Sequence, residues 1–434
     1  MAAFTGNRRI RACAATLVGA AMLCISTMPA HAQDARAQRP GAGGESDAHR
    51  QLDLRWTVVG AYDDDVTAEM QGPIDPRFQR KGVFGRESAS LQFRSHGKHA
   101  SFSATAASNA LYYPDLRTLT QFDGSGNVTV ATDIGAKTKI QASQDVTYLP
   151  YYELKILNGL VPQDSEPIRS DAALTAHDSH GYTGHFGLVE QFTPRSALTV
   201  EYEYRYTQFS ASARPFVWQL GRARFSHHLT RAAALRVGYG YGTGQFGQQA
   251  GTAPLVTHDL DLGIDYSRAL AFSRRTTISF GSGSTLVPSA QGLGYYVNAD
   301  ASLNRQIGRT WKASLLYHRG VQMTEGIAEP LYVDTAIVRL GGFVTRRFSF
   351  TVNGAYSSGR IGIAAENRRF TTYTAESDLR IAITRILAAY VHYMNYRYAF
   401  DSAADVPFGL PPLMNRQGLR VGISGTLPLV RSRR

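Results

Sequence analysis

The sequence predicts an all-β protein, a transmembrane antiparallel up-and-down β-barrel of about 18 strands, with roughly 16 to 20 compatible with the pattern. Three observations predict this fold. Apolar and polar residues alternate over many short segments, a turn motif recurs along the chain, and tyrosines recur near one end of the alternating segments. Side chains alternate between the two faces of a strand, so each segment would form a ribbon with one apolar and one polar face.

An export signal precedes these segments. Arg8, Arg9 and Arg11 stand before an apolar run over residues 14–25, and Ala30-His31-Ala32 has the small-x-small pattern of a cleavage site. The run is shorter than the ~20 residues of a membrane-spanning helix. We therefore expect residues 1–32 to be a cleaved signal peptide.

Both cysteines of the chain, Cys13 and Cys24, lie inside this signal. A lipid anchor at Cys24 is the alternative to simple cleavage, but Met22-Leu23 lacks the small residues of such a site. The mature chain is predicted to have no disulfide, cysteine nucleophile or thiolate metal site. We expect it to comprise a flexible segment over 33–51, a barrel over 52–430 and a basic tail over 431–434.

The first alternating segment is LDLRWTVVGAYDDDV, Leu52 to Val66. Leu52, Trp56 and Tyr62 fall on one face, and Asp53 and Arg55 fall on the other. In a membrane barrel the apolar face would meet lipid and the polar face would line the lumen. The three aspartates at 63–65 would mark the place where the strand leaves the membrane.

A short pattern, a small or polar residue followed by a basic residue and an alternating run, recurs at spacings of about 40 residues. The copies are HGKHASF from His96, GAKTKIQ from Gly135, TPRSALTV from Thr193, LTRAAALRV from Leu229, FSRRTTISF from Phe272, IGRTWKASL from Ile307, VTRRFSFTV from Val344 and ITRILAAYV from Ile383. Each is typical of a tight turn between two strands. Eight hairpins contain sixteen strands, and one strand before them and one after them bring the predicted number of strands to eighteen.

The strands that rise from these turns tend to finish with a tyrosine on the apolar face. The predicted aromatic girdle is Tyr62, Tyr112, Tyr148, Tyr206, Tyr241, Tyr317 and Tyr356. Amphipathic rings at one height are typical of a membrane–water boundary. The connections at the tyrosine end are long and those at the basic end short, as in outer-membrane barrels with short periplasmic turns and long extracellular loops.

A soluble sandwich or β-solenoid is the alternative fold, because its strands also alternate. It explains neither the export signal, the tyrosine rows nor the regular exchange of short turns and long loops.

Charged residues gather on the predicted inner face. The predicted pore-lining residues are Asp53, Arg55, Glu201, Glu203, Arg205, Arg236, Asp259, Asp261, Asp265, Arg339, Glu376, Asp378, Arg380, Arg416 and Arg420. Opposed charges across a pore can orient polar solutes. The alternative is that these charges pair with one another and only keep the wall wet.

The longest connection, roughly residues 149–177, is the third on the outer side. Its candidate constriction residues are Leu154, Ile156, Asp164, Glu166, Arg169 and Asp171. Because apolar residues in an exterior loop need cover, the loop either folds into the barrel and narrows it or packs as a compact surface loop.

Charge and motifs exclude several other classes. The formal net charge is +12, but the basic residues of the mature chain concentrate at the turns, which predicts anchoring to lipid phosphates and no binding of nucleic acid. His177, His180 and His185 do not share one strand face, and Asp63–Asp65 lacks the spacing of a calcium loop. No G-x-S-x-G occurs, and no cofactor, metal or enzymatic activity is predicted.

The segments GAYDDDV at 60–66, HDLDLGIDYSRAL from His258 and GLRVGISGTLPLV from Gly418, together with the turn series, are similar to those of bacterial outer-membrane β-barrel porins. The chain most resembles the group linked to exopolysaccharide export systems, over essentially the whole mature chain. The resemblance implies a location in the outer membrane of a Gram-negative cell, contact with its lipid, and a partnership with polysaccharide export machinery. The chain departs from this pattern at its end, because barrels of this kind usually finish on an aromatic residue and this one finishes with Val430 and then the basic segment Arg431 to Arg434.

Three functions follow as hypotheses. The first is passive or weakly selective diffusion of small hydrophilic solutes through the barrel. The second is an accessory barrel of an exopolysaccharide export system, and the third is a non-conducting adhesion or scaffold barrel. The solute, the oligomeric state and the partner complex stay open.

Overall fold

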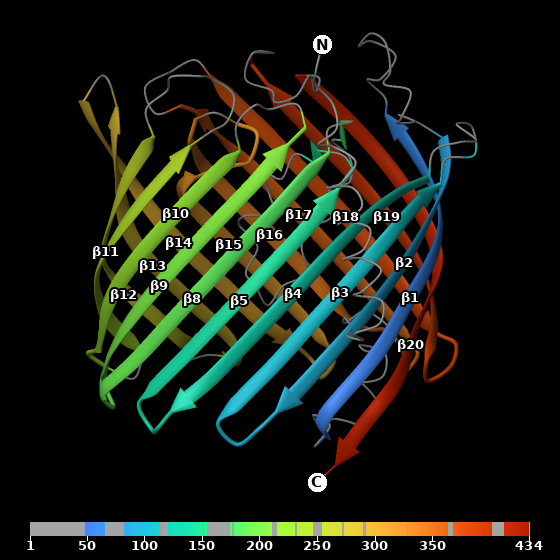
Figure 1. The fold of residues 1–434 in the computed structure, drawn as a ribbon, viewed down its shortest axis with the longest axis horizontal. Coiled ribbons are helices and arrows are strands. Elements are labelled where there is room, and N and C mark those ends of the chain that lie inside the picture. Colours follow the sequence, from blue (N-terminus) through green and yellow to red (C-terminus); the bar gives the residue numbers. More distant parts are fainter. Residues whose placement is uncertain are drawn as a thin grey trace, which may run out of the picture.

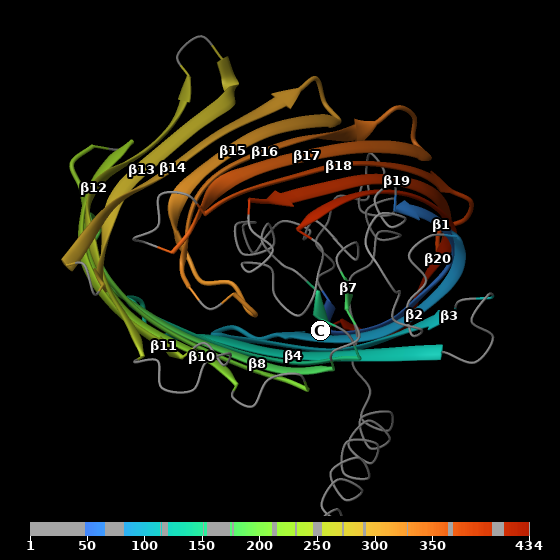
Figure 2. The same ribbon diagram turned by 90° about the horizontal axis from the view of Figure 1, so that it is seen from above.

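The computed structural model describes residues 48–65, 82–112, 114, 120–150, 152–153, 174–175, 178–210, 215–230, 232–245, 254–270, 273–289, 292–327, 329–362, 368–401 and 412–433. Eighteen antiparallel strands form one continuous ring (Figure 1). The view from above shows that the ring is oval (Figure 2). The predicted fold class and strand number are confirmed.

The ring strands are β1 (Ala48–Asp65), β2 (Gly82–His96), β3 (Ala100–Tyr112), β4 (Thr120–Ile134), β5 (Thr138–Leu149), β8 (Ser179–Thr193), β9 (Ser196–Phe209), β10 (Phe216–His228), β11 (Ala233–Gln245), β12 (Leu255–Leu270), β13 (Ser273–Ser289), β14 (Gly292–Ile307), β15 (Trp311–Gln322), β16 (Leu331–Phe343), β17 (Phe348–Ile361), β18 (Arg369–Ala382), β19 (Leu387–Phe400) and β20 (Leu413–Arg433). Two short strands, β6 (Tyr152–Glu153) and β7 (Leu174–Thr175), pair with each other apart from the ring.

The ring closes between its first and last strands. β1 pairs with β20 from Ala48 opposite Arg433 to Asp65 opposite Arg416. Every other ring strand pairs with its neighbours along the chain. Closure leaves no sheet edge with unpaired backbone groups, which is the condition for a sheet inside a bilayer.

The two ends of the predicted barrel differ slightly from the structure. β1 begins at Ala48, before the predicted start at Leu52. β20 continues through Arg431 to Arg433, where a separate basic tail was expected. These arginines extend the closing strand because β1 offers pairing partners as far as Ala48.

The outer wall of the barrel is apolar, and its inner wall is polar over much of its height. In β1, Trp56 is 40% exposed and faces outward, whereas Arg55 beside it is fully buried and faces inward. In β12, Leu262 is 70% exposed and lies between the inward-facing Asp261 and Gly263. A soluble protein buries the opposite face, so this arrangement is that of a barrel surrounded by lipid. The described residues include no helix that is long and apolar enough to cross a bilayer.

The short connections lie together at one end of the barrel (Figure 1). Gly135 and Gly308 stand in two of these turns with positive φ angles of 73° and 64°, a conformation that glycine adopts without strain. Lys137, Arg309 and Arg385 are exposed at the same end. Basic residues therefore form a rim at the short-turn end of the barrel.

Tyrosines mark the other end of the outer wall. Of the predicted girdle, Tyr206 is half-buried and the other members are more than a third exposed: Tyr62, Tyr112, Tyr148, Tyr241, Tyr317 and Tyr356.

Candidate channel lumen

Strand parity places all fifteen predicted pore-lining residues on the inner face. In each of their strands the neighbouring residues that are large, apolar and exposed have the opposite parity, such as Tyr202 in β9 and Leu419 in β20. The residues lie on β1, β9, β11, β12, β16, β18 and β20. They therefore occupy two separate parts of the wall, one around β9–β12 and one around β16–β20 and β1.

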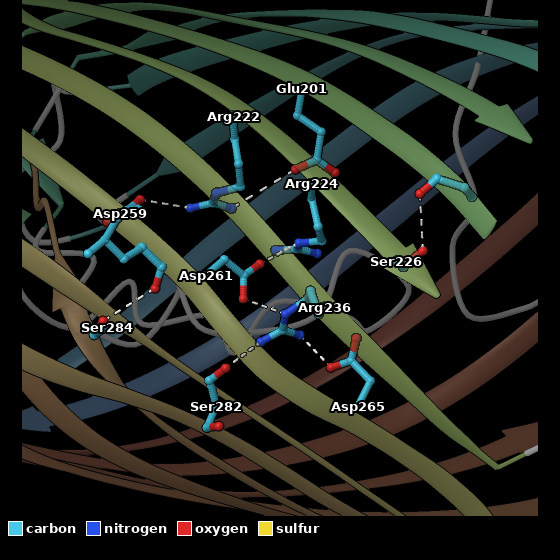
Figure 3. A network of polar contacts seen from close by, with 12 residues as sticks. Glu201, Arg222, Arg224, Ser226, Arg236, Asp259, Asp261, Asp265, Ser282 and Ser284 are labelled. Carbon is cyan, nitrogen blue, oxygen red and sulfur yellow. Dashed lines mark hydrogen bonds and ion pairs between the residues drawn. The ribbon is translucent and has the colours of Figure 1, made fainter. Parts of the chain in front are cut away.

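On the first part, arginines of β10 and β11 lie between acidic side chains of β9 and β12 (Figure 3). Arg222 of β10 lies between two carboxylates, with nitrogen–oxygen distances of 3.0 Å to Asp259 and 4.0 Å to Glu201. Arg224 lies 2.6 Å from Asp261. Each pair joins adjacent or next-neighbour strands of one wall, so the charges are balanced along the wall and not across the lumen.

Arg222 and Arg224 were not among the predicted pore-lining residues. They stand in the segment LGRARFS, where they alternate with Ala223 and the exposed Phe225. The same period of two that identified the other residues would have found them.

Arg236 has a different role, because it occupies a break in the β12–β13 ladder. The register between these strands shifts between Leu260 and Tyr266, which leaves backbone groups there without ladder partners. Arg236 donates a hydrogen bond of 2.8 Å to the carbonyl oxygen of Ser282 inside this break, and it also binds the carboxylates of Asp261 and Asp265 (Figure 3). An unsatisfied carbonyl is costly at membrane depth, so Arg236 completes the wall.

Glycines on the inner face of β11 make room for side chains of the neighbouring strands. A Cβ atom at Gly240 would lie 3.1 Å from the Cβ of Asp259. At Gly244 it would lie 2.6 Å from the ring of Trp218, closer than real Cβ contacts. The indole of Trp218 thus lies flat against the glycine backbone of β11.

The second charged part of the wall is more deeply buried. Asp63 accepts a hydrogen bond of 2.7 Å from Arg416 across the β1–β20 closure, and both residues are almost fully buried. Asp378 and Arg380 pair within β18. Asp53 and Arg55 are both at most 1% exposed.

An apolar cluster occupies the inner face toward the long-loop end. It joins Phe209, Phe216 and Trp218 of the β9–β10 hairpin region to residues of the opposite wall, among them Leu331, Ile337, Ile361, Phe370, Met394, Tyr396, Tyr398, Phe400 and Met414. The sequence had suggested a uniformly polar inner wall, but this cluster makes part of the inner wall apolar. Tyrosines were expected mainly on the lipid face, but Tyr396 and Tyr398 of β19 face inward.

The connection between β15 and β16 belongs to this cluster. Met323, Thr324 and Ile327 are all buried, and the amide of Ile327 donates to the carbonyl of Thr324 in a turn. Seen from above, this segment curves from the wall into the ring (Figure 2). The connection therefore packs its apolar side chains into the inner-face cluster at the long-loop end.

The third outer connection, which was the predicted constriction, is described only at its base. β6 and β7 pair through Tyr152 with Thr175 and Glu153 with Leu174, and β7 projects inside the ring in Figure 2. The candidate residues lie outside the described part of the chain: Leu154, Ile156, Asp164, Glu166, Arg169 and Asp171.

The histidines and aspartates considered for metal binding are separated. The ring of His180 contacts that of Tyr148 on the outer face, whereas His185 faces inward 3.9 Å from Glu203. Asp63 faces inward to Arg416, and Asp64 has the opposite parity. Within the described ranges no three histidine, cysteine or acidic side chains are grouped as metal ligands would be. His177 lies outside those ranges.

Comparison with known proteins gives a likeness of fold alone. No family model and no curated protein matches the sequence. Three solved structures from Pseudomonas aeruginosa are similar in strand arrangement. OccK2 (OpdF) has a TM-score of 0.47 at 9% identity, covering 88% of this chain and 98% of its own. OpdL has a TM-score of 0.42 at 12% identity, covering 88% and 99%, and OpdK with vanillate has a TM-score of 0.42 at 9% identity, covering 87% and 99%.

Proposed function

We propose that the protein is an outer-membrane channel for passive or weakly selective diffusion of small hydrophilic solutes. One observation carries the proposal: a closed ring of eighteen strands turns apolar side chains outward and charged side chains inward. A barrel of this size holds a water-filled lumen unless something fills it. The export signal expected at residues 1–32 supports the location.

The lumen is narrowed near its outer end. The β15–β16 connection and the apolar cluster occupy the inner face there, while the charged pairs of β10–β12 line the wall nearer the short turns. A solute would enter past apolar and aromatic groups and then meet a wall of paired charges. The inner-face residues named from the sequence are proposed as its lining, except Asp53 and Arg55, which are at most 1% exposed.

An accessory role in exopolysaccharide export is not favoured over diffusion. Inward-facing aromatic rings could stack on sugars, but Tyr396 and Tyr398 are at most 1% exposed. Rings that are covered by other side chains are not available to a passing polymer.

Single-channel recording tests the proposal. The mature protein, with folding checked by heat-dependent electrophoretic mobility, would be inserted into a planar bilayer in potassium chloride. Stepwise, steady conductance is expected. A folded protein that gives no conductance would contradict the proposal and leave a scaffold or export accessory as the alternative.

A further inference from the structure

Four arginines stand on the outward face of four of the five neighbouring strands β15–β19, just beyond the exposed tyrosines at the long-loop end. They are Arg319 of β15, Arg360 of β17, Arg369 of β18 and Arg397 of β19. The inward-facing neighbours of the last two, Phe370 and Tyr398, are at most 1% exposed. On the other ring strands, no described residue of this face and height is arginine or lysine. We refer to the four arginines as the outer arginine patch.

The register brings two of these charges into direct opposition. Arg360 and Arg369 are cross-strand partners between β17 and β18. Like charges directly opposite each other on one sheet face repel. A negative group that binds both guanidinium groups would relieve this repulsion.

Two of the arginines are held by an aromatic ring. Arg319 donates a hydrogen bond of 2.8 Å to the hydroxyl of Tyr332, and its guanidinium lies 5.3 Å from the centre of the ring. The guanidinium of Arg360 lies 6.0 Å from the same ring. These contacts orient the cations and leave hydrogen-bond donors for a ligand.

The described part of the chain supplies too little negative charge. Asp334 lies 3.5 Å from Arg319, and Glu329 is paired with Arg368. Asp401 donates its amide to the carbonyl of Arg369, but its carboxylate forms no ion pair among the described residues. Arg360, Arg369 and Arg397 likewise form none there, so the patch has a positive surplus.

We propose that the outer arginine patch binds the phosphate groups of a phosphorylated glycolipid of the outer leaflet, the lipid A part of lipopolysaccharide. A guanidinium group can donate two parallel hydrogen bonds to two oxygens of one phosphate group. The tyrosines place the patch at headgroup height. Below it, exposed Leu315, Val338 and Val391 of the neighbouring strands β15, β16 and β19 offer an aliphatic surface to the acyl chains. The inference shares with the proposed function only the outer-membrane location and orientation.

The test compares two triple variants with the unchanged protein. In the first, Arg360→Gln, Arg369→Gln and Arg397→Gln remove three charges from the patch. In the control, Arg346→Gln, Arg347→Gln and Arg385→Gln remove the same charge from exposed turns at the opposite end. Each protein is folded in detergent and titrated with bisphosphorylated lipid A and with the dephosphorylated lipid, and bound lipid is measured by native mass spectrometry.

The unchanged protein and the turn variant should bind bisphosphorylated lipid A with similar affinity. A basic residue near an anionic surface contributes about fivefold in affinity, so the patch variant should bind roughly a hundredfold more weakly. Equal binding by the patch variant, equal loss in the turn variant, or equal binding of the dephosphorylated lipid would each overturn the proposal. Because the readout is lipid binding in detergent, a barrel that fails to conduct could still pass this test.

Discussion

At the scale of single residues, Arg236 shows that a charge on the inner wall can have a structural role. Its side chain is 13% exposed, and it binds two carboxylates and a backbone carbonyl where the β12–β13 ladder is interrupted. Arg205 of the same wall pairs with Glu203 and is more exposed, at 33%. The two arginines look alike in the sequence, but Arg236 supports the interrupted β12–β13 ladder, whereas Arg205 forms a partly exposed ion pair.

Arg236→Ala should destabilise the barrel strongly. Removing one partner of a buried charge network typically costs about 3–5 kcal/mol. Here the Ser282 carbonyl and the Asp265 carboxylate lose the guanidinium, while Asp261 keeps its ion pair with Arg224. The measurement is the free energy of unfolding from reversible urea titration in detergent or lipid vesicles. Arg205→Ala is the matched control and should cost about 1 kcal/mol or less. Equal losses in the two variants would show that the ladder break does not depend on Arg236.

Gly244 illustrates a residue whose importance lies in the side chain it lacks. A Cβ there would meet the Trp218 ring at 2.6 Å, whereas a Cβ at Gly221, on the neighbouring strand, would meet nothing within 4 Å. Both glycines lie in alternating strands and cannot be ranked from their own sequence context.

Gly244→Ala should therefore destabilise the protein by about 1–3 kcal/mol, the usual effect of overpacking. Gly221→Ala should be close to neutral. Combining Gly244→Ala with Trp218→Leu should cost less than the sum of the two single changes, because the smaller side chain removes the clash. Additive losses in urea unfolding would rule out the proposed contact between the ring and the glycine.

At the scale of elements, we infer that the β15–β16 connection limits the outer half of the lumen. Its buried Ile327 packs in the same cluster as residues of β9, β10 and β16–β20. The cluster thus links a short connection to opposite walls of the barrel. This makes the connection, and not strand number alone, the expected determinant of conductance.

Ile327→Asp should release this connection, because a buried carboxylate without a partner is strongly unfavourable in an apolar cluster. Single-channel conductance should rise, with more frequent fluctuations of the open level. Ile327→Val, which keeps an apolar side chain, should conduct like the unchanged protein. If the aspartate variant folds and its conductance is unaltered, the connection does not limit the pore.

At the scale of the whole molecule, charge is distributed by height and by face. Basic residues form a rim at the short turns, and the outer arginine patch lies at the opposite end on the outward face. On the inner face, the predicted residues comprise eight acids and seven arginines, to which the structure adds Asp63, Arg222 and Arg224. Acids and bases on this wall are nearly equal in number and largely paired.

A nearly balanced wall predicts weak ion selectivity. Across a bilayer with a tenfold gradient of potassium chloride, the reversal potential should lie close to zero compared with that of an ideally selective pore. The double variant Asp259→Asn and Asp261→Asn leaves Arg222 and Arg224 in excess and should shift the reversal potential toward anion selectivity. A strongly selective unchanged channel would contradict the balanced lumen.

The sequence by itself determined the barrel class, the strand number and the two faces of each strand. These follow from the alternation of side chains with a period of two and from the turn motifs. Both are local features, so they can be recognised within a single strand or turn. Leu52 to Asp65 could be divided into outward and inward residues without knowledge of a partner strand. The same alternation would also have identified Arg222 and Arg224.

Only the tertiary structure decided which inward residues meet. The approach of Arg236 to Ser282, the fit of Trp218 over Gly244 and the inward fold of the β15–β16 connection all depend on register and on strands distant in the sequence. The opposition of Arg360 and Arg369 likewise appears only when β17 and β18 are paired. Alternation assigns a residue to a face, but shear and closure of the ring set its height and neighbours, and charge pairing depends on both.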